Sequence, residues 1–194
     1  GMIAVGGRDC LFVAVVLPGE SETEEIVSDK LIRTHIAKKP IVSEAFIKTE
    51  ENEDGTLRSI SFKDEDRFNF AFDVVDAIAK KNPDKLAMLH ISNDKTERRF
   101  SFNDMKRASN QCANYFKSLG IKKGDRVMLV LKRHYQFWFA ILGLHKLGAI
   151  AIPATNQLQK HDFEYRFNAA GINTVICTAD GDVAHQVELA EKES

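Results

Sequence analysis

The stretch GDRVMLVLKRHYQFWFAILGLHKLGAIAIPAT, residues 124–155, decides the fold class of this chain. Its first apolar run, residues 127–131, follows a Gly-Asp turn and is typical of a strand buried on both faces of a parallel sheet. Residues 134–147 carry apolar side chains at helical spacing, and Gly148 is the residue type that most readily ends a helix. The apolar run 149–152, closed by a proline, predicts a second buried strand.

The same stretch is apolar enough to raise the alternative of a membrane span. A spanning helix needs about 20 apolar residues in one conformation. Gly143, Gly148 and Pro153 interrupt the run, and the central Lys146 would cost about 3 kcal/mol in lipid. We therefore expect a strand-helix-strand unit folded in water and no membrane span.

The α/β pattern extends to both sides of this unit. On the amino-terminal side it predicts a helix over 73–81, strands over 86–91 and 98–102, and a helix beginning at a Ser101/Asp104 capping box. On the carboxyl-terminal side it predicts a helix over 160–170, a strand over 174–178 and a last helix capped by Asp180.

Residues 2–66 have a different sequence pattern. Turn-forming residues separate apolar runs within 2–17 and again within 45–62, which predicts two hairpins, and 23–39 has the spacing of a helix. We therefore expect a small α+β piece over 1–66, followed over 67–194 by an incomplete α/β domain with a parallel sheet.

Charge and cysteine content narrow the class of protein. The 27 Lys and Arg residues balance 28 Asp and Glu residues without basic clustering on one face, which argues against a nucleic-acid partner. Cys10, Cys112 and Cys177 are widely separated and form neither a disulfide framework nor a zinc spacing. A reducing compartment, the cytoplasm, fits best.

No nucleotide-binding loop is visible, because the sequence has neither Gly-x-Gly-x-x-Gly nor a Walker motif. Lys132 and Arg133 end a predicted buried strand, where anion binding and simple solubility explain them about equally well. The histidines at 134, 145 and 161 lack a partner at a recognised catalytic spacing. An acidic first helical turn explains the remaining cluster better than metal binding does: Asp180, Asp182, His185 and Glu188.

Three segments in order carry a family resemblance. They are FNFAFDVVDAIAKKNPDKLAML, RRFSFNDMKRASNQCANYFKSLGIKKGDRVMLVL and HYQFWFAILGLHKLGAIAIPATNQLQKHDFEYRFNAAGINTVICTAD. Together with their spacings, they resemble the amino-terminal part of the adenylate-forming acyl-CoA synthetases, in the medium-chain and acetyl-CoA synthetase branch. The resemblance covers residues 68–194, and residues 2–66 depart from the usual start of that family.

The resemblance implies an acid-thiol ligase that activates a carboxylic acid as acyl-AMP and transfers the acyl group to CoA. The family's phosphate loop, aromatic-Thr-Glu motif, ribose-binding Asp and lid Lys are all missing from this sequence. The chain is therefore interpreted as an inactive fragment with no catalytic residue of its own. The alternative is a non-enzymatic α/β interaction or scaffold module.

The resemblance also implies two contacts in the complete enzyme, which would use ATP, Mg²⁺ and CoA. Arg166 matches an arginine near the start of a helix that lies close to the CoA nucleotide, although a surface arginine is an equally good interpretation. Trp138 is placed to reach the acyl pocket, against the simpler interpretation of core packing. The expected partners are the missing remainder of the synthetase and, through exposed apolar surface, a second copy of the chain.

Overall fold

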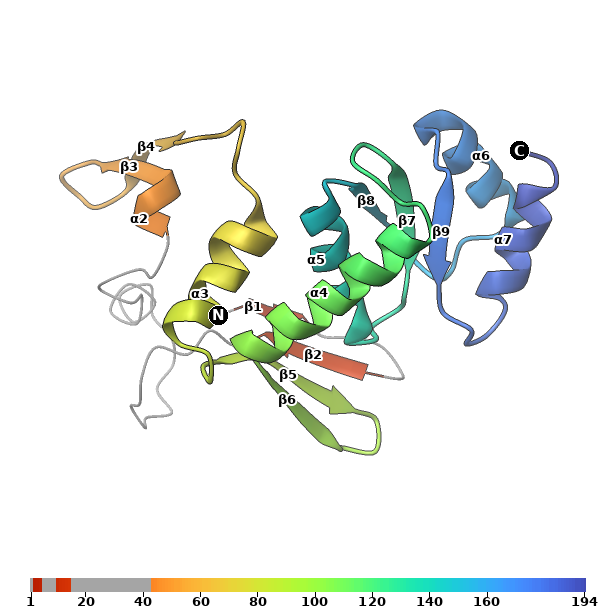
Figure 1. Cartoon of the computed structure of the whole chain (residues 1–194), viewed down its shortest axis with the longest axis horizontal. Helices are drawn as coiled ribbons and strands as arrows, with labels where there is room; N and C mark the ends of the chain where they lie inside the picture. Colours follow the sequence, from red (N-terminus) through yellow and green to blue (C-terminus); the bar gives the residue numbers. More distant parts are fainter. Residues whose placement is uncertain (1, 5–9, 15–42) are drawn as a thin grey trace.

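The computed structural model describes residues 2–4, 10–14 and 43–194. Their strands form three sheets, with helices between them (Figure 1). The helix predicted over 23–39 lies outside the described residues.

A three-stranded parallel sheet forms the centre of the α/β part. Strand β7 (Arg126–Val130) lies between β8 (Ile150–Pro153) and β9 (Thr174–Cys177), in the order β8-β7-β9. The predicted buried strand at the start of the 124–155 stretch is confirmed, because the four residues from Val127 to Val130 are 0% exposed.

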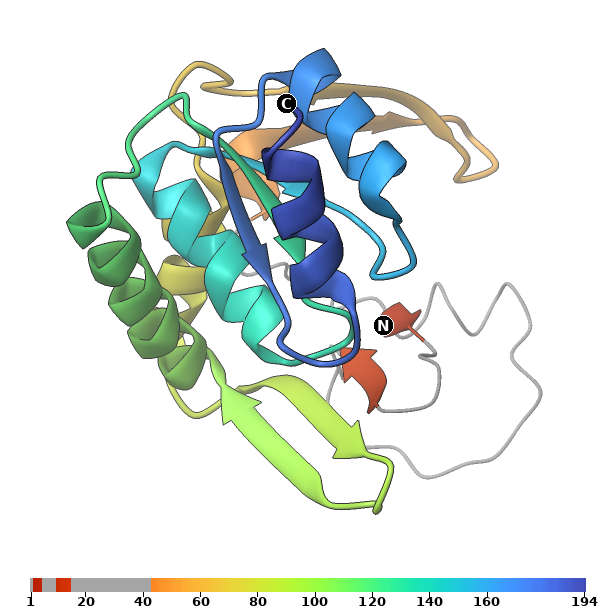
Figure 2. The same cartoon turned by 90° about the vertical axis from the view of Figure 1, so that its right-hand side faces the viewer.

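Helices cover both faces of this sheet. Figure 2 shows α4 (Phe102–Ser118) and α5 (Gln136–Leu147) on one face, and α6 (Lys160–Ala170) and α7 (Val183–Glu191) on the other. Because successive strand residues point to opposite faces, β7 supplies both cores. One core lies beneath α4 and α5, and the other lies beneath α6 and α7. The first contains Val127 and Leu129, and the second contains Met128 and Val130.

Local sequence signals set the ends of these helices. The Ser101 side chain accepts a hydrogen bond from the Asp104 backbone N–H, and the Asp104 carboxylate accepts one from the Ser101 backbone N–H, so the predicted capping box is confirmed. Gly148 ends α5 in the left-handed conformation with φ of 70°, as predicted. The strand-helix-strand unit therefore forms as predicted. The expectation that its second strand is buried is wrong, because β8 is an edge strand of this sheet and Ile150 is 47% exposed.

A second, antiparallel sheet combines strands from the start of the chain with strands from residues 86–101. Strands β1 (Met2–Ala4) and β2 (Cys10–Ala14) pair as the predicted hairpin, and β2 also pairs with β5 (Leu86–Ser92), which in turn pairs with β6 (Glu97–Ser101). The first hairpin is thus hydrogen-bonded to a strand beyond residue 67. The predicted domain boundary itself stays a prediction.

The second predicted hairpin is also confirmed. Helix α2 (Ser43–Phe46) leads into β3 (Ile47–Glu51), which pairs with β4 (Leu57–Phe62) in a separate two-stranded sheet. Large apolar side chains of β4 remain exposed on this hairpin.

The helix predicted from residue 73 begins earlier than expected. It opens as a π-helix, η1 (Phe70–Asp76), which continues as α3 (Ala77–Lys81). The Asn69 side chain accepts hydrogen bonds from the Ala71 and Phe72 backbone N–H groups, and its amide donates to the His145 carbonyl at 2.7 Å. This cap, tied to the end of α5, fixes the earlier start.

A buried ion pair joins η1 to α5 and α4. The Lys146 ammonium donates to the Asp76 carboxylate at 2.8 and 3.0 Å and to the Asn110 side-chain oxygen at 2.7 Å. It also lies 5.4 Å from the centre of the Phe72 ring. The Lys146 side chain is only 3% exposed, so this charge depends on its protein partners rather than on water.

Candidate functional site

Arg166 borders a hollow of about 370 Å³ between α6 and the end of β8. The fully buried Phe163 anchors α6 against the sheet, while Tyr165 and Arg166, in the second turn, are exposed. The other side chains around the hollow are mainly small or apolar: Met128, Ile152, Pro153, Ala154, Thr155, Ala169, Ala170 and Ile172. The hollow therefore combines one exposed guanidinium with an apolar wall.

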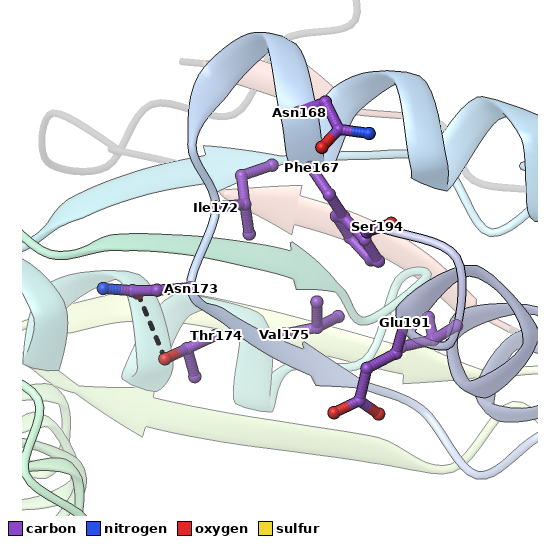
Figure 3. A pocket seen from close by; sticks show the side chains of 9 residues that line it. Phe167, Asn168, Ile172, Asn173, Thr174, Val175, Glu191 and Ser194 are labelled. Carbon is purple, nitrogen blue, oxygen red and sulfur yellow. Dashed lines mark hydrogen bonds between the residues drawn. The ribbon is translucent and has the colours of Figure 1, made fainter.

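A second hollow of about 450 Å³ lies between α6, β9 and α7 (Figure 3). Figure 3 shows Phe167 and Val175 on its wall, with Glu191 and Ser194 at its edge. Glu191 is the charged residue among those lining it. With one carboxylate and no neighbouring base or cation in the lining, this hollow has no set of groups for catalysis.

Trp138 packs into the core between α5 and the amino-terminal elements. It is half-buried, contacts the cluster that contains Ala71 and Val75, and meets the Phe137 ring edge-on at 5.4 Å. Neither hollow is lined by Trp138. Its role in an acyl pocket stays a prediction.

The carboxyl ends of β7 and β9 bring four polar side chains together. The His134 Nε2 atom lies 3.0 Å from the Thr178 hydroxyl and 3.1 Å from the Asp180 Oδ2 atom. The Lys132 ammonium lies 3.8 Å from the same Asp180 oxygen. We call these four residues the strand-end cluster.

The strand-end cluster adds contacts that the sequence did not indicate and corrects one prediction. His134 does have a hydroxyl and a carboxylate partner, which parallel pairing of β7 with β9 brings close from 44 and 46 positions away. Asp180 does not cap the last helix, because α7 begins after Asp182 and the Asp180 carboxylate turns to His134 instead. The signal available in the sequence was that polar residues follow both strands at one edge of a parallel sheet.

The strand-end cluster is not a catalytic triad. A triad needs the hydroxyl and the carboxylate on different imidazole nitrogens, so that a proton leaves one side while the other is held. Here Thr178 and Asp180 both approach Nε2 of His134. The arrangement therefore places an imidazole and an ammonium beside one carboxylate oxygen and lacks the geometry that activates a nucleophile.

The two other histidines considered in the sequence analysis lie outside the strand-end cluster. His145 is partly buried, and burial lowers its pKa, whereas His161 lies exposed beside Asp162 at 3.4 Å. In the part of the chain that the structure describes, no three His, Cys, Asp or Glu side chains are placed to hold a metal ion.

The alternative of a membrane span is tested by the lengths of the helices. Among residues 2–4, 10–14 and 43–194, no helix has both the length and the apolar character that crossing a bilayer requires.

The fold and the order of its elements define an α/β protein with a parallel sheet covered on both faces. Residues 75–194 match the model of the AMP-binding enzyme family. The chain belongs to this family.

The chain matches only part of the length of its relatives. Acyl-coenzyme A synthetase ACSM5, mitochondrial, from Rattus norvegicus is 33% identical over 124 residues, which cover 61% of this chain and 21% of the relative. Crotonobetaine/carnitine--CoA ligase from Salmonella paratyphi A is 34% identical over 104 residues, covering 54% of this chain and 20% of the relative. The matched part therefore represents about a fifth of each relative's length.

Solved structures show the same likeness. A fatty acyl CoA synthetase from Mycobacterium tuberculosis matches with a TM-score of 0.54 and 27% identity, over 62% of this chain and 23% of that one. The N-terminal domain of FACL13 from the same organism matches with a TM-score of 0.53 and 26% identity, over 60% of this chain and 29% of that one.

Proposed function

We propose that this chain is the amino-terminal part of an ATP-dependent acid-thiol ligase. The enzyme would join a carboxylic acid to ATP as acyl-AMP with release of pyrophosphate, and then pass the acyl group to the thiol of CoA with release of AMP. The observation that carries the proposal is the family match over residues 75–194 on a sheet whose helices and strands follow the expected order. Relatives named as acyl-CoA synthetases and as a CoA ligase support the reaction class.

The groups that would perform adenylation are proposed to lie outside these 194 residues. The sequence has no glycine-rich phosphate loop, and the described residues hold no acidic cluster suited to Mg²⁺. Transfer of an adenylyl group depends on electrostatic stabilisation of the phosphates. The isolated chain is therefore expected to be inactive, and ATP, Mg²⁺ and CoA belong to the complete enzyme.

Two residues of this chain are proposed to contribute to substrate binding. Arg166 would contact a phosphate group of CoA, since its guanidinium is exposed beside the 370 Å³ hollow and can bind phosphate through two N–H groups. Trp138 would border the acyl pocket in the complete enzyme. Its partly exposed ring supports this role, although the ring also packs against the core.

The test is thioester formation by the complete polypeptide, that is, the product of the natural gene that contains these residues. We expect acyl-CoA to form with short or medium carboxylic acids, ATP and CoA. Arg166→Ala should raise the KM for CoA about tenfold or more, because a charge-assisted hydrogen bond is lost, while the adenylation half-reaction stays nearly unchanged. Arg107→Ala, which removes an exposed arginine of α4, is the matched control and should change neither.

Two outcomes would contradict the proposal. Equal loss of both half-reactions in Arg166→Ala would assign Arg166 a folding role. Failure to form a thioester with any acid would favour the alternative, a non-enzymatic scaffold or interaction module. The cytoplasmic location and a homo-oligomeric state stay predictions, to be checked by cell fractionation and analytical ultracentrifugation.

A further inference from the structure

The strand-end cluster lies at a topological switch point of the parallel sheet. After β7 the chain passes into α5 on one face of the parallel sheet, whereas after β9 it passes into α7 on the opposite face (Figure 2). Strands β7 and β9 are hydrogen-bonded neighbours, so the direction of the chain switches from one face to the other at their carboxyl ends, where the two following loops meet. Such a switch point is where open α/β sheets bind ligands.

The backbone of the strand-end cluster is strained at one residue. Lys132 has φ of 47°, in the left-handed region that side chains with a Cβ rarely adopt. It occupies a turn closed by the His134 backbone N–H donating to the Leu131 carbonyl at 3.0 Å. Asparagine or glycine would fit this turn with less strain, and strained positions of this kind gather at ligand-binding sites.

Two members of the strand-end cluster, His134 and Lys132, already flank one anionic oxygen. Oδ2 of Asp180 receives the His134 imidazole at 3.1 Å and the Lys132 ammonium at 3.8 Å. The Thr178 residue is 6% exposed, and its hydroxyl lies 3.0 Å from the same imidazole nitrogen. The Asp180 side chain is 56% exposed, so it can turn into solvent and leave these donors to an external anion.

The surrounding charge favours an anion as well. Arg133 follows Lys132 in the same loop and is exposed. On the neighbouring antiparallel sheet, Arg98 lies 5.8 Å from the centre of the Tyr135 ring, next to His134 in sequence. Asp180 is the acidic member of the strand-end cluster, and its carboxylate lies beside both Lys132 and His134.

We propose that the strand-end cluster is a binding site for a phosphate group, either inorganic phosphate or a phosphate monoester. Lys132, His134 and Thr178 donate hydrogen bonds to the phosphate oxygens, and Asp180 occupies the place of one of these oxygens until the ligand displaces it. A lysine, an imidazole and a hydroxyl suit a tetrahedral anion with several acceptor oxygens. The site is separate from the hollow beside Arg166.

The test compares phosphate-dependent stabilisation of the full 194-residue chain and its variants at pH 7. Inorganic phosphate and glycerol phosphate at about 10 mM, a concentration that fills a millimolar site, should raise the midpoint of thermal unfolding. Sodium acetate at the same ionic strength should not. The larger shift of the two phosphate arms identifies free phosphate or an ester as the preferred form.

Two substitutions separate binding from folding. Asp180→Asn removes the competing carboxylate and should tighten phosphate binding about tenfold, measured by titration calorimetry. Lys132→Asn suits the left-handed turn, so it should leave the midpoint without ligand nearly unchanged while it abolishes the phosphate-dependent shift. Arg107→Ala on α4 is the control and should bind phosphate like the unmodified chain.

The proposal is overturned if phosphate fails to stabilise both the unmodified chain and Asp180→Asn. It is also overturned if Lys132→Asn retains the shift, or if Asp180→Asn lowers the midpoint and weakens binding. This last result would mean that Asp180 only ties the two loops together.

Discussion

The buried ion pair between Lys146 and Asp76 allows a quantitative prediction of stability. Asp76→Ala would leave the Lys146 ammonium, with a side chain 3% exposed, without its carboxylate. Removing one member of a buried pair costs about 3–5 kcal/mol, which corresponds to more than a hundredfold in the folding equilibrium. Because the total stability of a domain is typically about 5–15 kcal/mol, this single change should remove a large fraction of the free energy of unfolding.

The assay is urea unfolding followed by fluorescence of Trp138, the one tryptophan of the chain. The tryptophan packs against the cluster that includes Val75 of η1, so it reports on the affected region. The urea midpoint should fall while the slope of the unfolding free energy against urea concentration stays constant, because the surface exposed on unfolding is unchanged. Glu50→Ala breaks the exposed Lys48–Glu50 pair and, as the control, should have little effect.

A compensated double substitution tests the reason for the loss. Replacing Asp76 with leucine and Lys146 with methionine removes both charges and keeps similar volume, so stability should return close to that of the unmodified chain. If Asp76→Ala changed stability no more than Glu50→Ala, the Lys146 ammonium would have to be solvated, and the reasoning would be refuted.

Three further changes have defined outcomes. Gly143→Ala should destabilise the chain by about 1–3 kcal/mol in urea unfolding, because the added methyl would lie 2.8 Å from the Cys112 Cβ atom at the contact of α4 and α5. Ser101→Ala should cost about 1 kcal/mol through loss of the α4 cap, seen as a lower thermal midpoint. Burial, with smaller effects of neighbouring positive charges, lowers the pKa of His90 from 6.5. The unfolded chain then binds a proton that the folded chain does not, so stability should fall as pH drops below about 6.5, and His90→Phe should flatten this dependence between pH 5 and 7.

The part of the fold that could be predicted from the sequence depends on local patterns of apolar, glycine and capping residues. In the 124–155 stretch, the spacing of apolar residues distinguishes the strands from the helix, and a glycine stands where the helix ends in the left-handed conformation. Its strands and helix therefore follow from short-range rules. The Ser101/Asp104 capping box is likewise contained within four residues. Such features need no knowledge of distant contacts.

The features that the sequence did not reveal depend on distant partners. His134 meets Thr178 and Asp180 only because β7 and β9 pair in parallel, and residue spacing alone does not contain that register. The early start of η1 depends on Asn69 bonding to the carbonyl of His145, 76 residues away. The pairing of β2 with β5 joins the first hairpin to a later strand in the same way.

The central claim is that this chain supplies the amino-terminal part of an acid-thiol ligase while the adenylating groups lie elsewhere in the complete enzyme. The most direct measurement is acid-dependent exchange of labelled pyrophosphate into ATP by the 194-residue chain, with a panel of short and medium carboxylic acids. We expect no exchange above background for the chain, and exchange for the complete polypeptide with at least one acid. Acid-dependent exchange by the chain alone would contradict the claim.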